Sequence, residues 1–143
     1  MSFLLWNRSK TISISAISVF GYSAGEFGDT NTTTIEITFT GEVNSPGGDY
    51  DGGVTIKINA VPVTILSSSR QDPDTDIVHY VIDTTTDIND VVTWEYDDDF
   101  GDLEDSESVP LGDVTAQVTT NYVGSQYYFD TQESSMWLSA SVL

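Results

Sequence analysis

The stretch that decides the fold reads GVTIKINAVPVTI and covers residues 53–65. Its first half alternates apolar and polar side chains, which is the pattern of a half-buried β-strand. The pair Asn59-Ala60 then predicts a two-residue hairpin turn, although alanine fits poorly where such a turn needs positive φ. The second half, residues 61–65, alternates again, and Pro62 predicts an edge position or a bulge because proline cannot donate to a ladder.

The rest of the chain repeats this pattern of short alternating runs separated by polar turns. Further strands are predicted over residues 12–19, 35–39, 77–82, 91–96 and 114–120, with a bulge where the alternation changes phase at Ala16-Ile17. Turn residues gather at 25–31, 45–53, 71–76, 87–90 and 97–113. No segment carries a helix signature, so the sequence predicts an all-β, immunoglobulin-like antiparallel β-sandwich of about seven strands.

Composition divides the chain into three parts. We expect an N-terminal arm over residues 1–11, the sandwich over residues 12–123 and an aromatic C-terminal tail over residues 124–143. The first 25 residues contain no acidic side chain, whereas residues 26–113 contain 21 of the 23 acids. Within the sandwich, Val92, Trp94 and Tyr96 share one strand face and are predicted to be core, with an exposed aromatic surface as the alternative.

The charge balance limits the possible partners. The 143 residues include 23 acidic and 4 basic side chains, for a net charge of −19. Such a surface repels nucleic acid and anionic membranes, both of which are bound through lysine and arginine. No apolar run approaches the roughly 20 residues of a membrane-spanning helix. There is no cysteine, which excludes disulfides, thiol catalysis and cysteine metal sites. We therefore expect neither nucleic acid nor a membrane as partner.

Seven short motifs together resemble the bacterial immunoglobulin-like repeat of the SwmB type, a module of large surface proteins. In chain order they are IEITF (35–39), GVTIKIN (53–59), VPVTI (61–65), DVVTWEY (90–96), GDLED (101–105), VPL (109–111) and VTTNYV (118–123). The resemblance implies the sandwich fold and supplies no catalytic residue. Family members usually form tandem repeats, whereas this sequence holds one copy with added arms. In that respect it resembles the lone domains of tailed-phage virion structural and decoration proteins.

The strongest local feature is an acidic run over residues 95–107, which contains eight carboxylates. Calcium takes about six to eight oxygen ligands from carboxylates and carbonyls, so Asp97, Asp99, Asp102 and Asp105 are candidate calcium ligands. The spacing does not match an EF-hand loop. The alternative is a solvated loop whose charges keep a sheet edge from pairing. Apart from this calcium possibility, we expect no cofactor.

The remaining polar candidates favour structural roles. Asp72, Asp74 and Asp76 surround a proline and are typical of turn chemistry, with part of an ion site between loops as the alternative. His79 is the only histidine and lies within a predicted strand, so it can build neither a zinc site nor a catalytic triad alone. Paired carboxylates could serve a glycosidase, but they crowd into one loop without an identifiable aromatic cleft. We expect no enzymatic activity.

Both ends of the chain carry apolar side chains outside the predicted sandwich. Short arms cannot bury this much apolar surface alone, so they either fold back onto the domain or dock on a neighbouring protein. Aromatic residues with methionine and arginine are favoured in interface cores. The interface candidates are Phe3, Leu4, Leu5, Trp6, Arg8, Tyr127, Tyr128, Phe129, Met136, Trp137 and Leu138.

The sequence thus favours a non-enzymatic structural protein. Its leading interpretation is a phage capsid decoration (cement) protein, located on the virion and assembled in the host cytoplasm. The arms would clamp the major capsid protein, another virion protein or a sister copy, which predicts a homo-oligomer. Stabilisation would come from binding the assembled state in preference to the dissociated one. The alternatives are a bacterial cell-surface adhesion module, with or without calcium, and a carbohydrate-binding sandwich.

Overall fold

The computed structural model describes residues 19–29 and 31–124, and these residues form eleven β-strands and no helix. The strands are β1 (Tyr22–Phe27), β2 (Thr34–Phe39), β3 (Val43–Asn44), β4 (Val54–Ile58), β5 (Val61–Pro62), β6 (Ile65–Arg70), β7 (Ile77–Ile82), β8 (Val92–Tyr96), β9 (Glu104–Asp105), β10 (Val114–Val118) and β11 (Thr120–Asn121). The all-β prediction is confirmed. Among the described residues no helix is long and apolar enough to cross a membrane.

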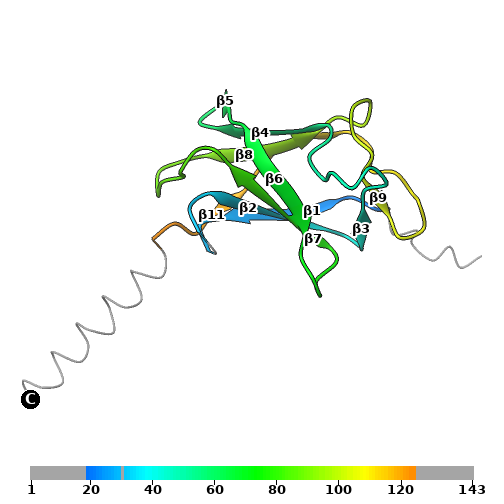
Figure 1. The fold of residues 1–143 in the computed structure, drawn as a ribbon. Helices are drawn as coiled ribbons and strands as arrows, with labels where there is room; N and C mark the ends of the chain where they lie inside the picture. The colour runs from blue at the N-terminus through cyan, green and yellow to red at the C-terminus, as the bar shows by residue number, and fades with distance from the viewer. Residues whose placement is uncertain (1–18, 30, 125–143) are drawn as a thin grey trace, which may run out of the picture.

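Two main sheets pack face to face as an immunoglobulin-like sandwich (Figure 1). One sheet has the order β11-β1-β2-β7-β6 and the other the order β10-β8-β4-β5, while β3 and β9 form a small ribbon at one end. All pairings are antiparallel except β1 with β11. The chain changes sheets at Thr119, whose amide and hydroxyl both donate to the carbonyl of Val92.

The core lies between the two sheets and is built around Trp94. This side chain is fully buried and stacks between Tyr22 and Tyr96, with ring centroids 5.7 Å and 6.2 Å away. Val92 and Tyr96 are buried on the same face, which confirms the predicted core of this strand. Inward isoleucine, valine and phenylalanine side chains from β2, β4 and β7 complete the core, as strand alternation requires.

The hairpin between β4 and β5 forms as the sequence predicts. Asn59 and Ala60 both have positive φ, at 51° and 68°, which is the geometry of a two-residue turn of this type. Pro62 lies in β5 at the edge of its sheet, where a missing N–H leaves no ladder bond unmade.

Three predicted boundaries are wrong and one predicted strand lies almost wholly outside the described residues. The strand expected over 114–120 is divided, because β10 ends at Val118 and β11 pairs in the other sheet. The turn expected over 25–31 begins only after Phe27, because residues 22–27 form β1. The strand expected over 61–65 is interrupted: β5 ends at Pro62, and a longer, serine-rich strand, β6, starts at Ile65. Of the strand expected over 12–19, only Val19 is described, and it lies outside any strand.

Candidate functional site

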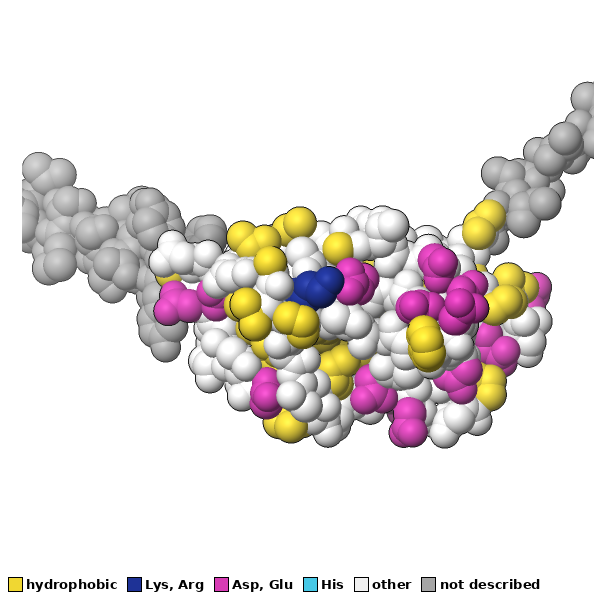
Figure 2. Space-filling model, turned by 90° about the horizontal axis from the view of Figure 1, so that it is seen from above, with side chains coloured by type: hydrophobic (Ala, Val, Ile, Leu, Met, Phe, Trp, Pro, Cys, Tyr) yellow, Lys and Arg dark blue, Asp and Glu magenta, His cyan; other side chains and the backbone are white. Residues whose placement is uncertain are grey.

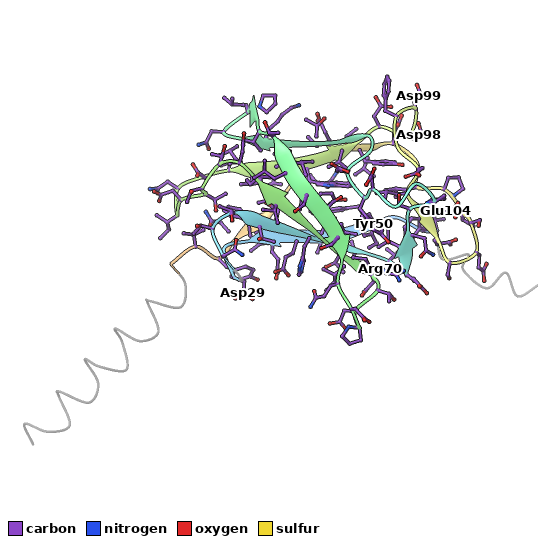
Figure 3. The ribbon with its side chains drawn as sticks, in the orientation of Figure 1. Asp29, Tyr50, Arg70, Asp98, Asp99 and Glu104 are labelled. Atoms are coloured by element: carbon purple, nitrogen blue, oxygen red, sulfur yellow. The ribbon has the colours of Figure 1, made fainter. Side chains whose placement is uncertain are left out.

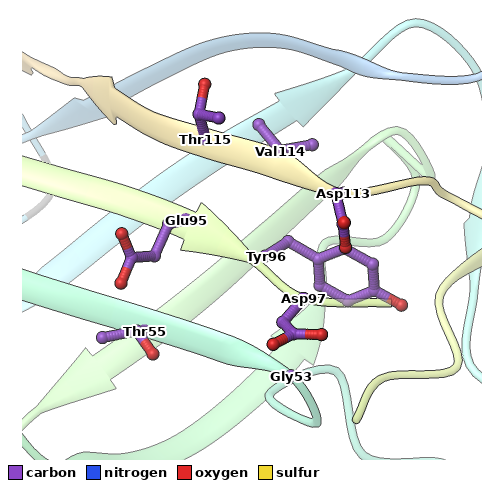
Figure 4. A pocket seen from close by; sticks show the side chains of 8 residues that line it. All are labelled: Gly53, Thr55, Glu95, Tyr96, Asp97, Asp113, Val114 and Thr115. Carbon is purple, nitrogen blue, oxygen red and sulfur yellow. The ribbon is translucent and has the colours of Figure 1, made fainter. Parts of the chain in front are cut away.

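An acidic cluster lies where β8 leaves the sandwich. Carboxylate oxygens of Asp97, Asp98 and Asp113 all lie within 4.8 Å of one another, and all three residues are exposed. Antiparallel pairing of Val114 with Tyr96 brings Asp113 beside the end of β8, where the amide of Asp98 donates to Asp113 Oδ1 at 2.9 Å. Asp97 and Asp113 border an open hollow of about 300 Å³, together with Gly53, Thr55, Glu95 and Thr115 (Figure 4).

The electrostatics of this cluster follow from crowding of like charges. A hydrogen bond with Asp113 and its negative charge raise the pKa of the Asp98 carboxyl, because ionisation places two anions side by side. Three carboxylates offer the ligand type that calcium prefers, but calcium takes about six to eight oxygens, so backbone or water would have to supply the others. The cluster can therefore share a proton or attract a cation.

The four calcium candidates named from the sequence are not brought together in the described part of the chain. Asp97 accepts a hydrogen bond from the amide of Asp99 in its own turn. Asp102 accepts from Ser45 Oγ and from the amide of Gly47, both at 2.8 Å, and so ties two loops together. Asp105 accepts from the amides of Glu107 and Val109. Three of these carboxylates, those of Asp97, Asp102 and Asp105, accept hydrogen bonds from backbone amides, and these bonds stabilise the turns of the loop.

The members of the cluster that sequence reasoning missed are Asp98 and Asp113. Asp98 belongs to the acidic run but was not singled out, and Asp113 lies beyond it. Only the pairing of β10 with β8 brings Asp113 close, and no local spacing in the sequence encodes that register. Figure 3 places Asp98 and Asp99 together at the tip of this loop, whereas Glu104 lies in the β3–β9 ribbon.

His79 takes part in a row of polar side chains across the outer face of the five-stranded sheet. Cross-strand pairing aligns Glu26 with Glu36, Glu36 with His79, and His79 with Ser69. His79 Nε2 lies 3.6 Å from Glu36 Oε2. Partial burial raises the pKa of Glu26, and the charges of Glu36 and Asp29 raise it further. His79 is therefore a cross-strand residue, as predicted.

The outer face of the four-stranded sheet combines hydrophobic and charged side chains. Register places Val118 opposite Thr93, Thr93 opposite Lys57, and Lys57 opposite Pro62. Lys57 Nζ bonds Glu95 Oε1 at 2.7 Å. Figure 2 shows this face, with basic atoms bordered by hydrophobic and acidic side chains and further acids gathered toward one end.

The acidic turn over residues 71–76 and the two arms complete the set of predicted sites. Asp72 and Asp74 are exposed, and Asp76 is half-buried in the turn that joins β6 to β7. The interface candidates in the arms, from Phe3 to Arg8 and from Tyr127 to Leu138, lie outside the described residues.

The fold is similar to parts of one bacterial surface-layer protein, SbsC. No family model and no curated protein matches the sequence. A crystal structure of the S-layer protein SbsC matches 71% of this chain at 12% identity with a TM-score of 0.58. The N-terminal part of the same protein matches 71% at 12% identity with a TM-score of 0.56, and its domains 1–6 match 73% at 12% identity with a TM-score of 0.58. The chain spans only 13%, 24% and 14% of those chains.

Proposed function

We propose that this protein is a non-enzymatic structural module of a bacterial surface assembly, which acts through contacts with neighbouring protein subunits. The observation that carries the proposal is the shared sandwich architecture with S-layer protein domains, at TM-scores between 0.56 and 0.58. Because the identity is 12%, the likeness concerns the fold, and the surface role is an inference by analogy.

The surface of the module fits a role in protein contacts. Hydrophobic side chains stand exposed on three strands and in one loop, namely Val61, Leu66 and Val118 on strands and Val91 in a loop. Acidic side chains dominate the loops, which favours solubility of the free subunit and disfavours contact with phosphate-rich partners. A rigid body with aromatic-rich arms and mixed faces is suited to binding other proteins.

The proposal adopts the cell-surface alternative of the sequence analysis. The surface-layer likeness favours that alternative over a capsid decoration role, because the three solved structures named above are all of the S-layer protein SbsC. Virion location and a capsid partner stay predictions from the sequence.

Assembly of the purified full chain tests the proposal. Light scattering over a wide concentration range, followed by negative-stain electron microscopy, should reveal ordered multimers at high concentration. The expected result is a mass that rises with concentration and particles with a repeating spacing. A chain that stays monomeric throughout, with and without cell-wall extract from a bacterium that carries a surface layer, would contradict a role in assembly.

A further inference from the structure

Strand β6 presents the longest open edge of the sandwich in the described part of the chain. β5 and β11 have two residues each, β5 contains Pro62, and β10 has a register shift between Val114 and Gln117. β6 ends its sheet, and after a shift between Ile65 and Ser67 it pairs residue for residue with β7 (Figure 1). Natural sheets usually block such edges with proline, bulges or outward charge.

The side chains of β6 leave this edge accessible. Ser67 and Ser69 are small and exposed. Arg70 turns away, since its Nη1 donates to Glu42 Oε1, to the carbonyl of Val43 and to Asn44 Oδ1. Figure 3 shows Arg70 and Tyr50 at this side of the sandwich.

The backbone of β6 has a defined set of groups facing outward. The amide of Gln71 donates to the carbonyl of Ile77, so alternation directs the N–H and C=O groups of Ser69 and Ser67 toward β7 as well. The same groups of Ser68 and Arg70 therefore point away from the sheet. An added strand must hydrogen-bond at these two positions.

The segment TISIS at residues 11–15 matches these requirements. We propose that this segment of one copy adds to the β6 edge of a second copy as an antiparallel strand, with Ser13 opposite Ser69 and Ser15 opposite Ser67. The inference rests on the proposed function, because it names the contact through which the module assembles. Strand addition of this kind gains affinity from main-chain bonds and specificity from alternate side chains.

Two independent features select this register. First, it places Ile12 and Ile14 at the hydrogen-bonded positions opposite Arg70 and Ser68. Ser68 pairs with buried Tyr80, so both isoleucines join the inner face and the serines join the outer face. A shift by one residue would reverse both faces.

Second, the register matches opposite charges. The antiparallel direction carries Lys10 and Arg8 past the end of β6 toward the turn that contains Asp72 and Asp74, both of which are exposed. A parallel strand would carry them to the opposite end of β6. Complementary charges at the ends of an interface fix its direction and register.

The same copy cannot supply this strand. The carbonyl of Val19 accepts from Thr40 Oγ1 at 3.1 Å, which fixes Val19 beside the end of β2. A strand added outside β6 would lie three strand spacings from β2, a distance of about 14 Å across the sheet. Gln71 lies at the level of the end of β2, and Ser67 is about 14 Å from it along the strand direction. These two perpendicular distances combine to a separation of about 20 Å between Val19 and the place of Ser15. The four residue steps from Ser15 to Val19 span at most about 14 Å, which is too short. The contact is therefore between copies. Each copy gives one strand and accepts another, which builds a ring or a filament.

A cysteine pair tests the register directly, because the sequence contains no cysteine. The full chain with Ser13→Cys and Ser69→Cys should form a ladder of disulfide-linked multimers under mild oxidation, since opposed residues outside the hydrogen-bonded pairs bring their side chains closest. Ser18→Cys with Ser69→Cys is the matched control and should link far less. Equal linking of both pairs, or a disulfide within one monomer, would overturn the proposal.

Proline substitutions separate this contact from assembly in general. Ile14→Pro removes a donor at a hydrogen-bonded position and should abolish multimers in light scattering, whereas Thr131→Pro in the tail should leave them intact. Multimers that survive Ile14→Pro would overturn the strand proposal, whatever Thr131→Pro does, and would leave the structural function standing. If the unmodified chain forms no multimer, the proposed function fails, and this inference fails with it.

Discussion

Tyr96 connects the core to the acidic loop through a single hydroxyl. Its oxygen accepts a hydrogen bond from the buried amide of Leu103 at 3.0 Å, while its ring stacks on Trp94. A side chain at Gly101 would collide with the Tyr96 ring, so glycine is required for this close approach. One aromatic residue thus holds the loop that carries the acidic cluster.

Tyr96→Phe should destabilise the fold by about 1–3 kcal/mol, because it leaves the buried amide of Leu103 without its acceptor. Urea denaturation followed by tryptophan fluorescence measures the change. Tyr22→Phe, which removes a hydroxyl from the other ring stacked on Trp94, is the matched control and should have a smaller effect. Equal effects of the two variants would refute the role given to the Tyr96 hydroxyl.

The pair Glu26 and Glu36 should make stability depend on pH. Burial and neighbouring charge raise the pKa of Glu26 in the folded state above its ordinary value of 4.5. The folded state then binds the proton more tightly than the unfolded state, so stability falls as pH rises through this range. Glu26→Gln should therefore raise the melting temperature at pH 7, and the gain should shrink toward pH 4.

Thermal melts at both pH values, with Glu107→Gln as the exposed control, measure this effect. The control should change the melting temperature little at either pH. A Glu26→Gln variant that is less stable than the parent at pH 7 would show that Glu26 contributes a favourable contact that outweighs the repulsion.

At the scale of the element, the Asn59-Ala60 turn stores strain in its alanine. Ala60 has a φ of 68°, where its Cβ meets the following carbonyl, at a cost of roughly 1–2 kcal/mol. Ala60→Gly should raise the free energy of unfolding by about 1 kcal/mol. Ala116→Gly in β10 is the control and should lower it by about 0.5–1 kcal/mol, since glycine weakens a regular strand. Chemical denaturation measures the free energy of unfolding of both variants. A lower value for Ala60→Gly than for the parent would contradict the strain assigned to Ala60.

The sequence predicts best the central strands of the two sheets, whose inward side chains form the core. β2, β4, β7 and β8 alternate clearly because their inward side chains are buried, apart from the half-buried Val54 of β4. β6 was missed because its serines carry no hydrophobic alternation, although pairing with β7 holds it in the sheet. The sequence predicts a turn over the second half of β1 because that half begins at Gly25. A Cβ there would lie 2.7 Å from Thr119 Cγ2 and 2.8 Å from Ile37 Cδ1, so this glycine serves close packing.

The candidate site was predicted only in part for a related reason. The sequence indicates an acidic loop, but loop closure uses Asp102 and Asp105 for backbone hydrogen bonds, while strand register brings in Asp113. Local composition reports which charges are present, and long-range pairing decides which of them meet.

At the scale of the whole molecule, the net negative charge and the open edge of β6 together determine how copies of the chain associate. The net charge of −19 opposes the approach of two copies, whereas the segment before residue 26 carries only basic charges. A donated N-terminal strand is therefore the part of the chain best suited to reach an acidic neighbour. The expected assembly is head-to-tail, which gives a ring or a filament.

The most direct test of the account is hydrogen–deuterium exchange of the full chain at low and at high concentration. Peptides covering β6 and residues 11–15 should gain protection as concentration rises, because Ser68 and Arg70 acquire backbone partners, while peptides from β5 and β10 should change little. Exchange that does not depend on concentration anywhere in the chain, or protection gained only outside β6, would contradict assembly through this edge.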